Sequence, residues 1–196
     1  MARFPRIHVA LLQPRIPHNT GQIGRSCLGF GNCALHLVGP LGFSLDAKQV
    51  KRSGLDYWDR VDVTHHEDWH NFRDGALRDL SRTGNVVVIS KREKYGTAAI
   101  DEATLFRPGD ETLTMVFGNE VSGIEDVLAV DPDALPHVTS PRLFIPMDTG
   151  GDEMETGGGV RSFNLATSVG IGLYEAGRQL RDLERHASSS ERIRYM

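Results

Sequence analysis

The chain has 196 residues, of which 39% are hydrophobic and 24% are charged, and its formal net charge is −4. This length and composition predict one folded domain and exclude a disordered or collagen-like chain. No apolar run reaches the roughly 18 residues of a membrane-spanning helix, so we expect a cytoplasmic protein. The charge is uneven, because residues 1–60 hold eight Lys/Arg and three Asp/Glu, whereas residues 101–155 hold two and thirteen. The basic N-terminal part suits contact with phosphates, unless folding mixes the two parts.

Short β-branched runs alternate with helix-like segments along the chain. This alternation is typical of an α/β fold with a mostly parallel sheet flanked by helices. We expect strands at residues 8–12, 34–39, 61–65, 86–90, 113–118 and 142–147. We expect helices at about 20–29, 47–54, 69–80, 124–130 and 162–180. Residues 1–180 then form a single domain, and residues 181–196 form a loose polar tail.

Two features invite a metal hypothesis, and the sequence favours neither. Cys27 and Cys33 are the only cysteines, and no further ligand pair lies near them at zinc spacing. His65, His66 and His70 lie in a polar stretch that is more simply explained as the start of a helix, with acidic residues in its first turn. We therefore expect no metal.

Three polar motifs follow predicted strands, which is where α/β proteins place their ligands. The first, N-x-G-x-x-x-R, runs from Asn19 to Arg25. Asn19 is expected to cap the helix that follows, and Arg25 to project from its second turn. An ordinary cap with a surface arginine is the alternative.

The second motif, F-G-N-E-x-x-G, covers residues 117–123. It lacks the Lys-Ser/Thr of a P-loop, and no G-x-G-x-x-G follows a strand, so neither common nucleotide-binding loop is present. Glu120 is either a functional carboxylate or a solvated side chain in a turn.

The third motif, R-S-F-N, covers residues 161–164 and opens the last helix. Ser162 suits an N-cap, whereas Asn164 is a poor helix former that needs another role. Gly170 and Gly172 inside the helix indicate close packing against another backbone, from a partner subunit or from the same chain.

In this order and spacing, the three motifs resemble the signature motifs of the SPOUT RNA methyltransferases. The resemblance extends to Leu180 through PRIPHNTGQIGRSC, LHLVGPLGFSLDAKQVKRSGLDYW, IPM and YEAGRQL. Within the family, the chain looks like the bacterial branch that methylates the ribose 2′-hydroxyl of tRNA nucleotide 34, the wobble nucleotide, as cytidine or modified uridine. The same chemistry on another tRNA or rRNA nucleotide is the first alternative. An inactive RNA-binding module is the second.

The resemblance implies a sheet with a C-terminal trefoil knot, a homodimer, and S-adenosylmethionine as methyl donor. It places the cofactor near Ile89, Gly118, Ile145, Met147, Ser162 and Phe163. It places catalytic residues around the acceptor ribose at Asn19, Arg25, Glu120, Ser162 and Asn164. The sequence departs from the branch at the acidic, glycine-rich segment 148–160, which lengthens the connection before the third motif. This departure leaves the contacts to the methionine part of the cofactor open.

Family accounts make the first-motif arginine, here Arg25, the base that takes the hydroxyl proton. Because an arginine stays charged in proteins, we instead expect its guanidinium to contact the adjacent phosphate and the developing alkoxide. Glu120 is expected to hold Arg25 or the loop backbone through charge-assisted hydrogen bonds. Arg15, Lys51 and Arg52 are candidate phosphate contacts, and a single-stranded anticodon loop suits them, since its sugars are accessible.

Overall fold

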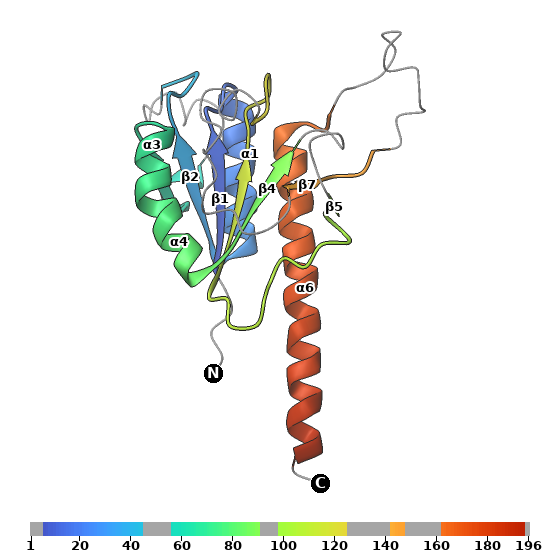
Figure 1. Cartoon of the computed structure of the whole chain (residues 1–196). Coiled ribbons are helices and arrows are strands. Elements are labelled where there is room, and N and C mark those ends of the chain that lie inside the picture. The colour runs from blue at the N-terminus through green and yellow to red at the C-terminus, as the bar shows by residue number, and fades with distance from the viewer. Residues whose placement is uncertain (1–5, 45–55, 91–97, 125–141, 148–161, 195–196) are drawn as a thin grey trace.

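The computed structural model describes residues 6–44, 56–90, 98–124, 142–147 and 162–194, with side chains in the last range described through residue 186. Its centre is a seven-stranded sheet in the order β3-β2-β1-β6-β4-β7-β5 (Figure 1). All of its strand pairs are parallel. The strands are β1 (Arg6–Leu12), β2 (Cys33–Val38), β3 (Val63–His66), β4 (Gly84–Ser90), β5 (Ala98–Ala99), β6 (Thr112–Phe117) and β7 (Arg142–Phe144).

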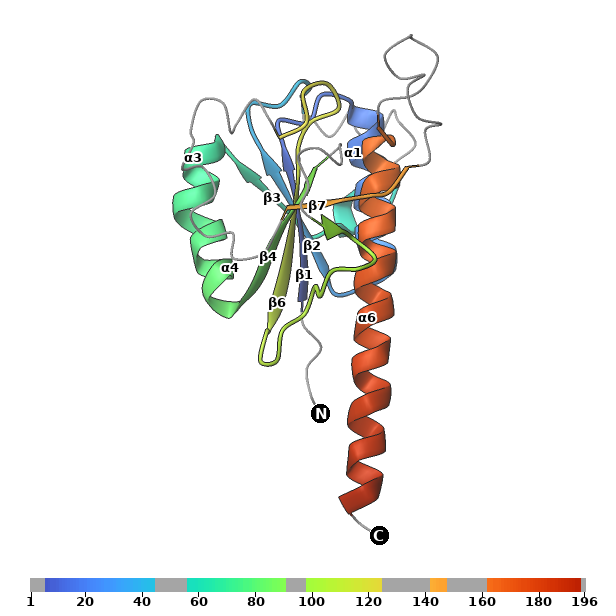
Figure 2. The same cartoon turned by 45° about the vertical axis from the view of Figure 1, so that its right-hand side comes forward.

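Helices cover both faces of this sheet, as Figure 2 shows in a nearly edge-on view. On one face lie α1 (Pro17–Phe30), the short η1 (Trp58–Arg60) and α6 (Leu165–Arg194). On the other face lies one continuous helical segment made of α3 (Trp69–Phe72), the π-helical turn η2 (Arg73–Leu77) and α4 (Arg78–Thr83). The expected α/β fold with a parallel sheet flanked by helices is therefore confirmed.

The central strands are buried on both sides, so they are apolar at nearly every position. In β1, Ile7, Val9 and Leu11 share a core cluster with side chains of α1 and α6. Ala10 and Leu12, which alternate with them, pack instead with side chains of α3 and η2. Polar side chains that can meet a ligand are therefore concentrated where the strands end.

A row of three buried histidines crosses β1, β2 and β3 on the face that α3 covers. His8 Nδ1 lies 3.0 Å from His36 Nε2, and His36 Nδ1 lies 2.9 Å from His66 Nε2. Phe72 of α3 packs against the rings of His36 and His66. Burial lowers the pKa of His8 to about 4 and that of His36 to about 3, with nearby positive charge adding to the effect. All three pKa values are lowered, so the row is neutral at pH 7.

Of the three histidines that invited a metal hypothesis, only His66 belongs to this buried row. His65 and His70 are exposed. In the part of the chain that the structure describes, no group of three His, Cys, Asp or Glu side chains is placed to hold a metal ion. Cys27 and Cys33 are free and buried in the core. A side-chain hydrogen bond with Cys27 and burial both favour the protonated thiol of Cys33 and raise its pKa.

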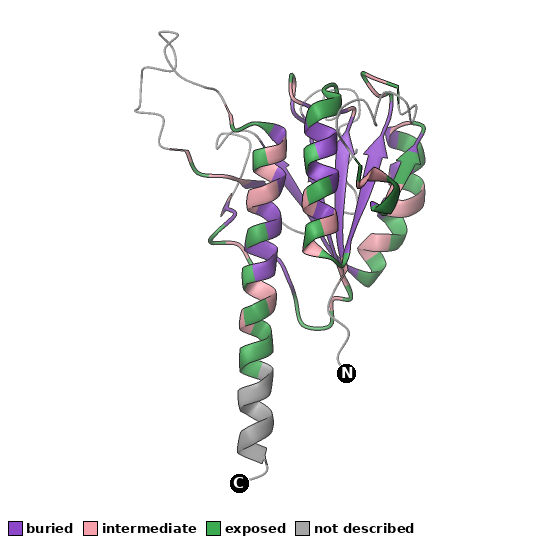
Figure 3. Ribbon diagram, turned by 180° about the vertical axis from the view of Figure 1, so that it is seen from behind, coloured by how far each residue is buried: buried purple, intermediate pink, exposed green. Residues whose placement is uncertain are grey.

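The last helix is longer than the sequence predicted. We expected it to end near Leu180 with a loose tail beyond, which is wrong, because α6 continues to Arg194 and extends past the sheet (Figure 3). Arg178 and Arg185 both pair with Asp182, at 2.9 and 3.2 Å. Such pairs three or four residues apart stabilise an exposed helix. The spacing of Arg178, Asp182 and Arg185 is therefore the sequence signal that indicates a helix beyond Leu180.

The middle of α6 is attached to the loop before β6 through Gln179, which in turn bonds the buried carboxylate of Glu175. Gln179 donates from Nε2 to Glu175 and to the Ala103 carbonyl, and it accepts from the Leu105 amide. Although burial alone raises the pKa of Glu175, hydrogen bonds from Arg178 and Gln179 hold it below its ordinary value. This network fixes the position of α6 on the sheet.

Other differences from the sequence prediction are local. The short edge strand β5 was not predicted, since two alanines carry no periodic signal. The expected helix at 47–54, most of that at 124–130, and segment 148–160 lie outside the described residues. A Cβ at Gly172 would contact side chains of Met115 and Phe117 of the same chain rather than another backbone, and one at Gly170 would contact nothing within 4 Å. No helix in the described ranges is long and apolar enough to cross a membrane.

Candidate active site

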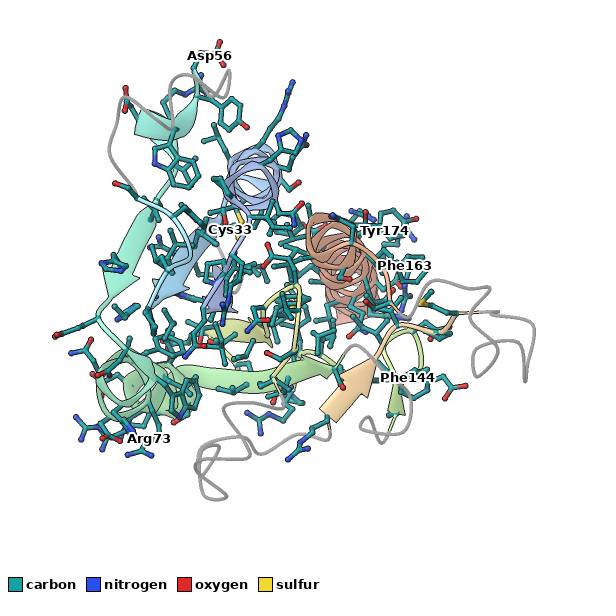
Figure 4. All side chains as sticks on the ribbon, turned by 90° about the horizontal axis from the view of Figure 1, so that it is seen from above. Cys33, Asp56, Arg73, Phe144, Phe163 and Tyr174 are labelled. Atoms are coloured by element: carbon teal, nitrogen blue, oxygen red, sulfur yellow. The ribbon has the colours of Figure 1, made fainter. Side chains whose placement is uncertain are left out.

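A cavity of about 230 Å³ lies at the carboxyl ends of β4 and β6, next to the beginnings of α1 and α6. Figure 4 looks down onto this edge of the sheet, with Phe163 labelled beside the start of α6. The lining residues come from four segments, at 16–19, 89–90, 117–123 and 162–168. Three of these segments carry the polar motifs identified in the sequence. Folding therefore brings together motifs that are far apart along the chain.

Glu120 joins the second motif to the first. Its carboxylate accepts hydrogen bonds from the Arg15 amide at 2.9 Å, the Ile16 amide at 3.2 Å and Asn19 Nδ2 at 3.0 Å. Of the two expected partners, Arg25 and the loop backbone, the structure shows the backbone. A carboxylate with three such donors fixes the loop that enters α1.

Asn164 joins the third motif to the first. Its Nδ2 donates to Asn19 Oδ1 at 3.0 Å, while its Oδ1 accepts from the amides of Ala166 at 2.8 Å and Thr167 at 3.4 Å. Asn164 therefore caps α6, and the prediction that Ser162 does so is wrong. Asparagine favours helix caps over helix interiors, so Asn164 stabilises α6 at this position.

Asn19 is not an N-cap, contrary to the prediction. Helix α1 begins at Pro17, preceded by Ile16, which makes no side-chain capping bond. Proline suits the first helical position because its missing N–H would have no partner there. Asn19 therefore lies inside the first turn, and its buried amide links Glu120 to Asn164.

The second motif forms a tight loop that holds Glu120 in place. Asn119 and Gly123 exchange two backbone hydrogen bonds, and Asn119 Oδ1 accepts from the amides of Val121 and Ser122. A Cβ at Gly118 would overlap the backbone of Gly123, and Gly123 has a φ of 71°. Both positions therefore need glycine, for space at Gly118 and for backbone conformation at Gly123.

The residues expected to bind the cofactor divide into two groups. Ile89, Gly118, Ser162 and Phe163 line the cavity. Ile145 instead packs against the core, and Met147 is half-buried and is not part of the lining. The lining also includes residues for which the sequence predicted no individual role, among them Ile16, Ser90, Asn119, Leu165 and Ser168. Ser90 ends a predicted strand and Asn119 belongs to the second motif. Their positions in the sequence could therefore have indicated that they lie near the ligand site.

Arg25 lies apart from the cavity in the single chain. It is exposed on α1, nearly two turns beyond Asn19, and its guanidinium carbon lies 5.7 Å from the centre of the Tyr57 ring. Arg15 is also exposed, and its backbone amide binds Glu120. Lys51 and Arg52 lie outside the described residues. The side chains that connect the three motifs are therefore amides and a carboxylate. Arg25, the cation expected beside them, is not among them.

Comparison with known proteins places the chain among RNA methylases. Residues 6–148 match the SpoU rRNA Methylase family. A tRNA (cytidine(34)-2′-O)-methyltransferase of Yersinia pestis is 35% identical over 174 residues, which cover 89% of this chain and 94% of that protein. A solved structure described as giving insights into the 2-OH methylation of C/U34 on tRNA is 40% identical, with a TM-score of 0.67, over 91% of this chain and 98% of the other.

The fold is shared more widely than the sequence. The SpoU methyltransferase AviRb from Streptomyces viridochromogenes, solved in complex with AdoMet, is 21% identical, with a TM-score of 0.64, over 91% of this chain and 60% of the other. At this identity the likeness concerns the fold alone. Since the family match spans most of the chain and the Yersinia pestis relative aligns along nearly all of its own length, this protein belongs to the SpoU rRNA Methylase family.

Proposed function

We propose that this protein transfers the methyl group of S-adenosylmethionine to the ribose 2′-hydroxyl of the wobble nucleotide, position 34, in tRNA. The observation that carries the proposal is the cavity at which the three motifs converge. It occurs in a chain 35% identical, over 89% of its length, to an enzyme named for this reaction. Fold alone would not support the function, because one fold hosts many activities.

The cavity has the mixed lining that a nucleoside with a sulfonium side chain needs. The lining includes the apolar residues Ile89, Phe117 and Leu165 together with Gly118 and Ser162, whose amide and hydroxyl groups are polar. Bound S-adenosylmethionine supplies a methyl group that is already electrophilic, so the reaction needs no metal or covalent enzyme intermediate. The protein's part is to hold the ribose oxygen in line with that methyl group.

Glu120, Asn19 and Asn164 act by holding the walls of the cavity in one arrangement. Each bonds another member or a backbone amide, so the three fix the loop before α1 against the start of α6. We therefore propose that Asn19 and Asn164 set the position of the acceptor ribose. Preorganised polar groups of this kind cost no reorganisation when the reaction takes place.

We also propose a homodimer in which Arg25 of one copy acts at the cavity of the other. No lysine or arginine lines the cavity within the described residues, whereas Arg25 is exposed on α1. Three side chains from the cavity segments are exposed and apolar, namely Ile16 at 44%, Val121 at 74% and Phe163 at 37%. A second copy covering these residues would remove apolar surface from water.

Mixed dimers test this arrangement. Arg25→Gln and Glu120→Ala subunits, each strongly reduced in activity alone, are mixed, unfolded and refolded together. If Arg25 acts in the partner's cavity, the mixture recovers about a quarter of wild-type methylation, because half of the dimers then contain one intact site. No recovery would place Arg25 in its own subunit's site.

A C-terminal trefoil knot is a further part of the proposal. β7 lies beyond β4, whereas α6, which follows β7, packs against α1 and β6 on the other side of β4. Residues 162–164, which lie directly before α6, line the cavity at the carboxyl ends of β4 and β6. An experimental structure traced through residues 118–165 tests whether the connection from β7 to α6 threads a loop.

Position 34 is tested with matched tRNA transcripts. One carries a ribose at nucleotide 34 and the other a 2′-deoxyribose, and both are incubated with the protein and S-adenosylmethionine labelled in its methyl group. We expect label only in the first, mapped to nucleotide 34 by mass spectrometry of nuclease fragments. Label in the deoxy transcript would move the site elsewhere, and label in rRNA alone would favour the substrate in the family's name.

A further inference from the structure

The short helix η1 packs onto the turn of α1 that carries Arg25. The Trp58 ring lies so close to Gly24 that a Cβ added there would be 2.6 Å from Trp58 Cζ3. Side-chain carbons do not approach one another this closely, so α1 needs glycine at this position. Gly24 therefore allows the segment that begins with Tyr57 to contact the helix directly.

Tyr57 contacts this turn at two points. Its hydroxyl donates to the Gly21 carbonyl at 3.1 Å, and its ring lies under Arg25, 5.7 Å from the guanidinium carbon. Gly21 and Arg25 are one helical turn apart, and helical side chains lean toward the N-terminus, so the guanidinium extends over the anchored ring. Burial raises the pKa of the Tyr57 hydroxyl against the opposing charge of Arg25. The hydroxyl therefore stays protonated and can donate at neutral pH.

The contact restrains Arg25 without using its hydrogen-bond donors. Within the described ranges, no carboxylate forms an ion pair with Arg25, which is unlike the paired arginines at positions 6, 107 and 178. A carboxylate partner would occupy the N–H groups and neutralise the charge. An aromatic ring below the guanidinium plane leaves all of them available to an anion. This is the arrangement required of a cation that binds a phosphate or an alkoxide.

We propose that Tyr57 is a positioning residue for Arg25, holding its guanidinium over the Gly21 turn so that it meets the RNA at the site of methylation. The inference rests on the proposed function. Tyr57 itself does not line the cavity and acts only through Arg25. The ring provides the restraint, and the hydroxyl fixes the ring.

Kinetics separate this role from general stability. Tyr57→Leu removes the ring and should lower kcat for tRNA about fivefold, the value of one exposed cation–π contact, with cofactor affinity unchanged. Tyr57→Phe keeps the ring and should stay within about twofold of wild type. In an Arg25→Gln background, Tyr57→Leu should cause no further loss. An equal loss in both backgrounds would overturn the proposal, because Tyr57 would then act independently of Arg25.

A second pair of variants tests the packing of the Tyr57–Trp58 segment on α1 and leaves the Tyr57 ring unchanged. Gly24→Ala pushes against Trp58 and should reproduce the loss seen in Tyr57→Leu. Gly29→Ala is its control on the same helix, since a Cβ there meets nothing within 4 Å, and it should leave kcat unchanged. Wild-type activity in Gly24→Ala would contradict the proposal.

The Arg25 Nε–Hε resonance in the NMR spectrum reports the contact without any reaction. An aromatic ring below the guanidinium shifts this signal, so Tyr57→Leu should move it and Tyr57→Phe should not. An identical signal in wild type and Tyr57→Leu would overturn the proposal. A wild-type protein that methylates no tRNA would overturn the proposed function and this inference together, whereas a Tyr57→Leu protein with the kcat of wild type would overturn only the inference.

Discussion

Two hydrogen-bonded polar clusters lie on the same sheet, and they differ in access to solvent. One joins Glu120, Asn19 and Asn164 at the edge of the cavity. The other is the histidine row on the opposite face, where Phe72 packs over two of its three rings. Both connect side chains from distant parts of the chain. The three histidines are buried, whereas in the Glu120 cluster Asn19 is buried, Glu120 is half-buried and Asn164 is exposed.

The difference shows that a buried polar network is not by itself a functional site. The histidine row has perturbed pKa values, which often mark active sites, yet its rings are sealed between β-strands and α3. The Glu120 cluster borders a cavity that also has apolar walls. We therefore expect the first cluster to control activity and the second to control stability.

The largest expected effect is on activity, from Glu120→Ala. This change leaves two loop amides and the Asn19 amide without their acceptor, so the loop before α1 loses its anchor. We expect tRNA methylation under single-turnover conditions to fall about 100-fold, the range found when a site loses its geometry. Glu102→Ala, which removes an exposed carboxylate away from the cavity, is the control. A small effect of Glu120→Ala would mean that the cluster does not organise the site.

The next effect is on acid stability, through the histidine row. The folded pKa values of His8 and His36, about 4 and 3, lie below the ordinary 6.5, so the unfolded chain binds more protons as the pH falls. Stability is therefore full above about pH 6.5 and is lost toward the folded pKa values. We expect a loss on the order of 5 kcal/mol between pH 7 and 4.5 in urea unfolding, about half of it from each histidine.

A histidine variant tests whether the histidine row causes the loss of stability at acid pH. In His36→Leu, the difference in unfolding free energy between the two pH values should shrink by up to about half, because His36 no longer titrates while His8 and His66 still do so against burial. Methylation at pH 7.5 should change less than it does in Glu120→Ala. Parallel pH curves for wild type and His36→Leu would show that other groups cause the acid loss.

The smallest effect is at Asn164, which combines two tasks. Asn164→Ala removes the cap of α6 and the bond to Asn19, and we expect a loss of about 1 kcal/mol in unfolding free energy. Asn164→Asp keeps the cap but cannot donate to Asn19, so it should restore stability without restoring methylation. Equal methylation by the Asp variant and wild type would show that the link to Asn19 is dispensable.

The sequence predicted the strands well because their β-branched, two-sided apolar runs have few alternatives. It also indicated the residues of the site, since the motifs follow strands whose ends become the cavity. It misplaced both helix starts near the cavity, because Asn19 and Ser162 have capping side chains but Pro17 and Asn164 take the decisive positions. The end of α6 was missed because the exposed turns after Leu180 carry charge pairs, as far as Arg185, instead of an apolar periodicity.

The amino-acid sequence by itself determined the strand segments, the family and the residue types of the site. The tertiary structure alone decided which partners these residues have. Glu120 binds the Arg15 amide 105 positions away because β6 lies beside β1, and Asn164 reaches Asn19 because α6 packs against α1. Strand order and helix packing bring such pairs together, and neither is encoded in the local periodicity from which strands and helices are predicted. For the same reason, Arg25 could be recognised from its motif, while its separation from the cavity appeared only in the folded chain.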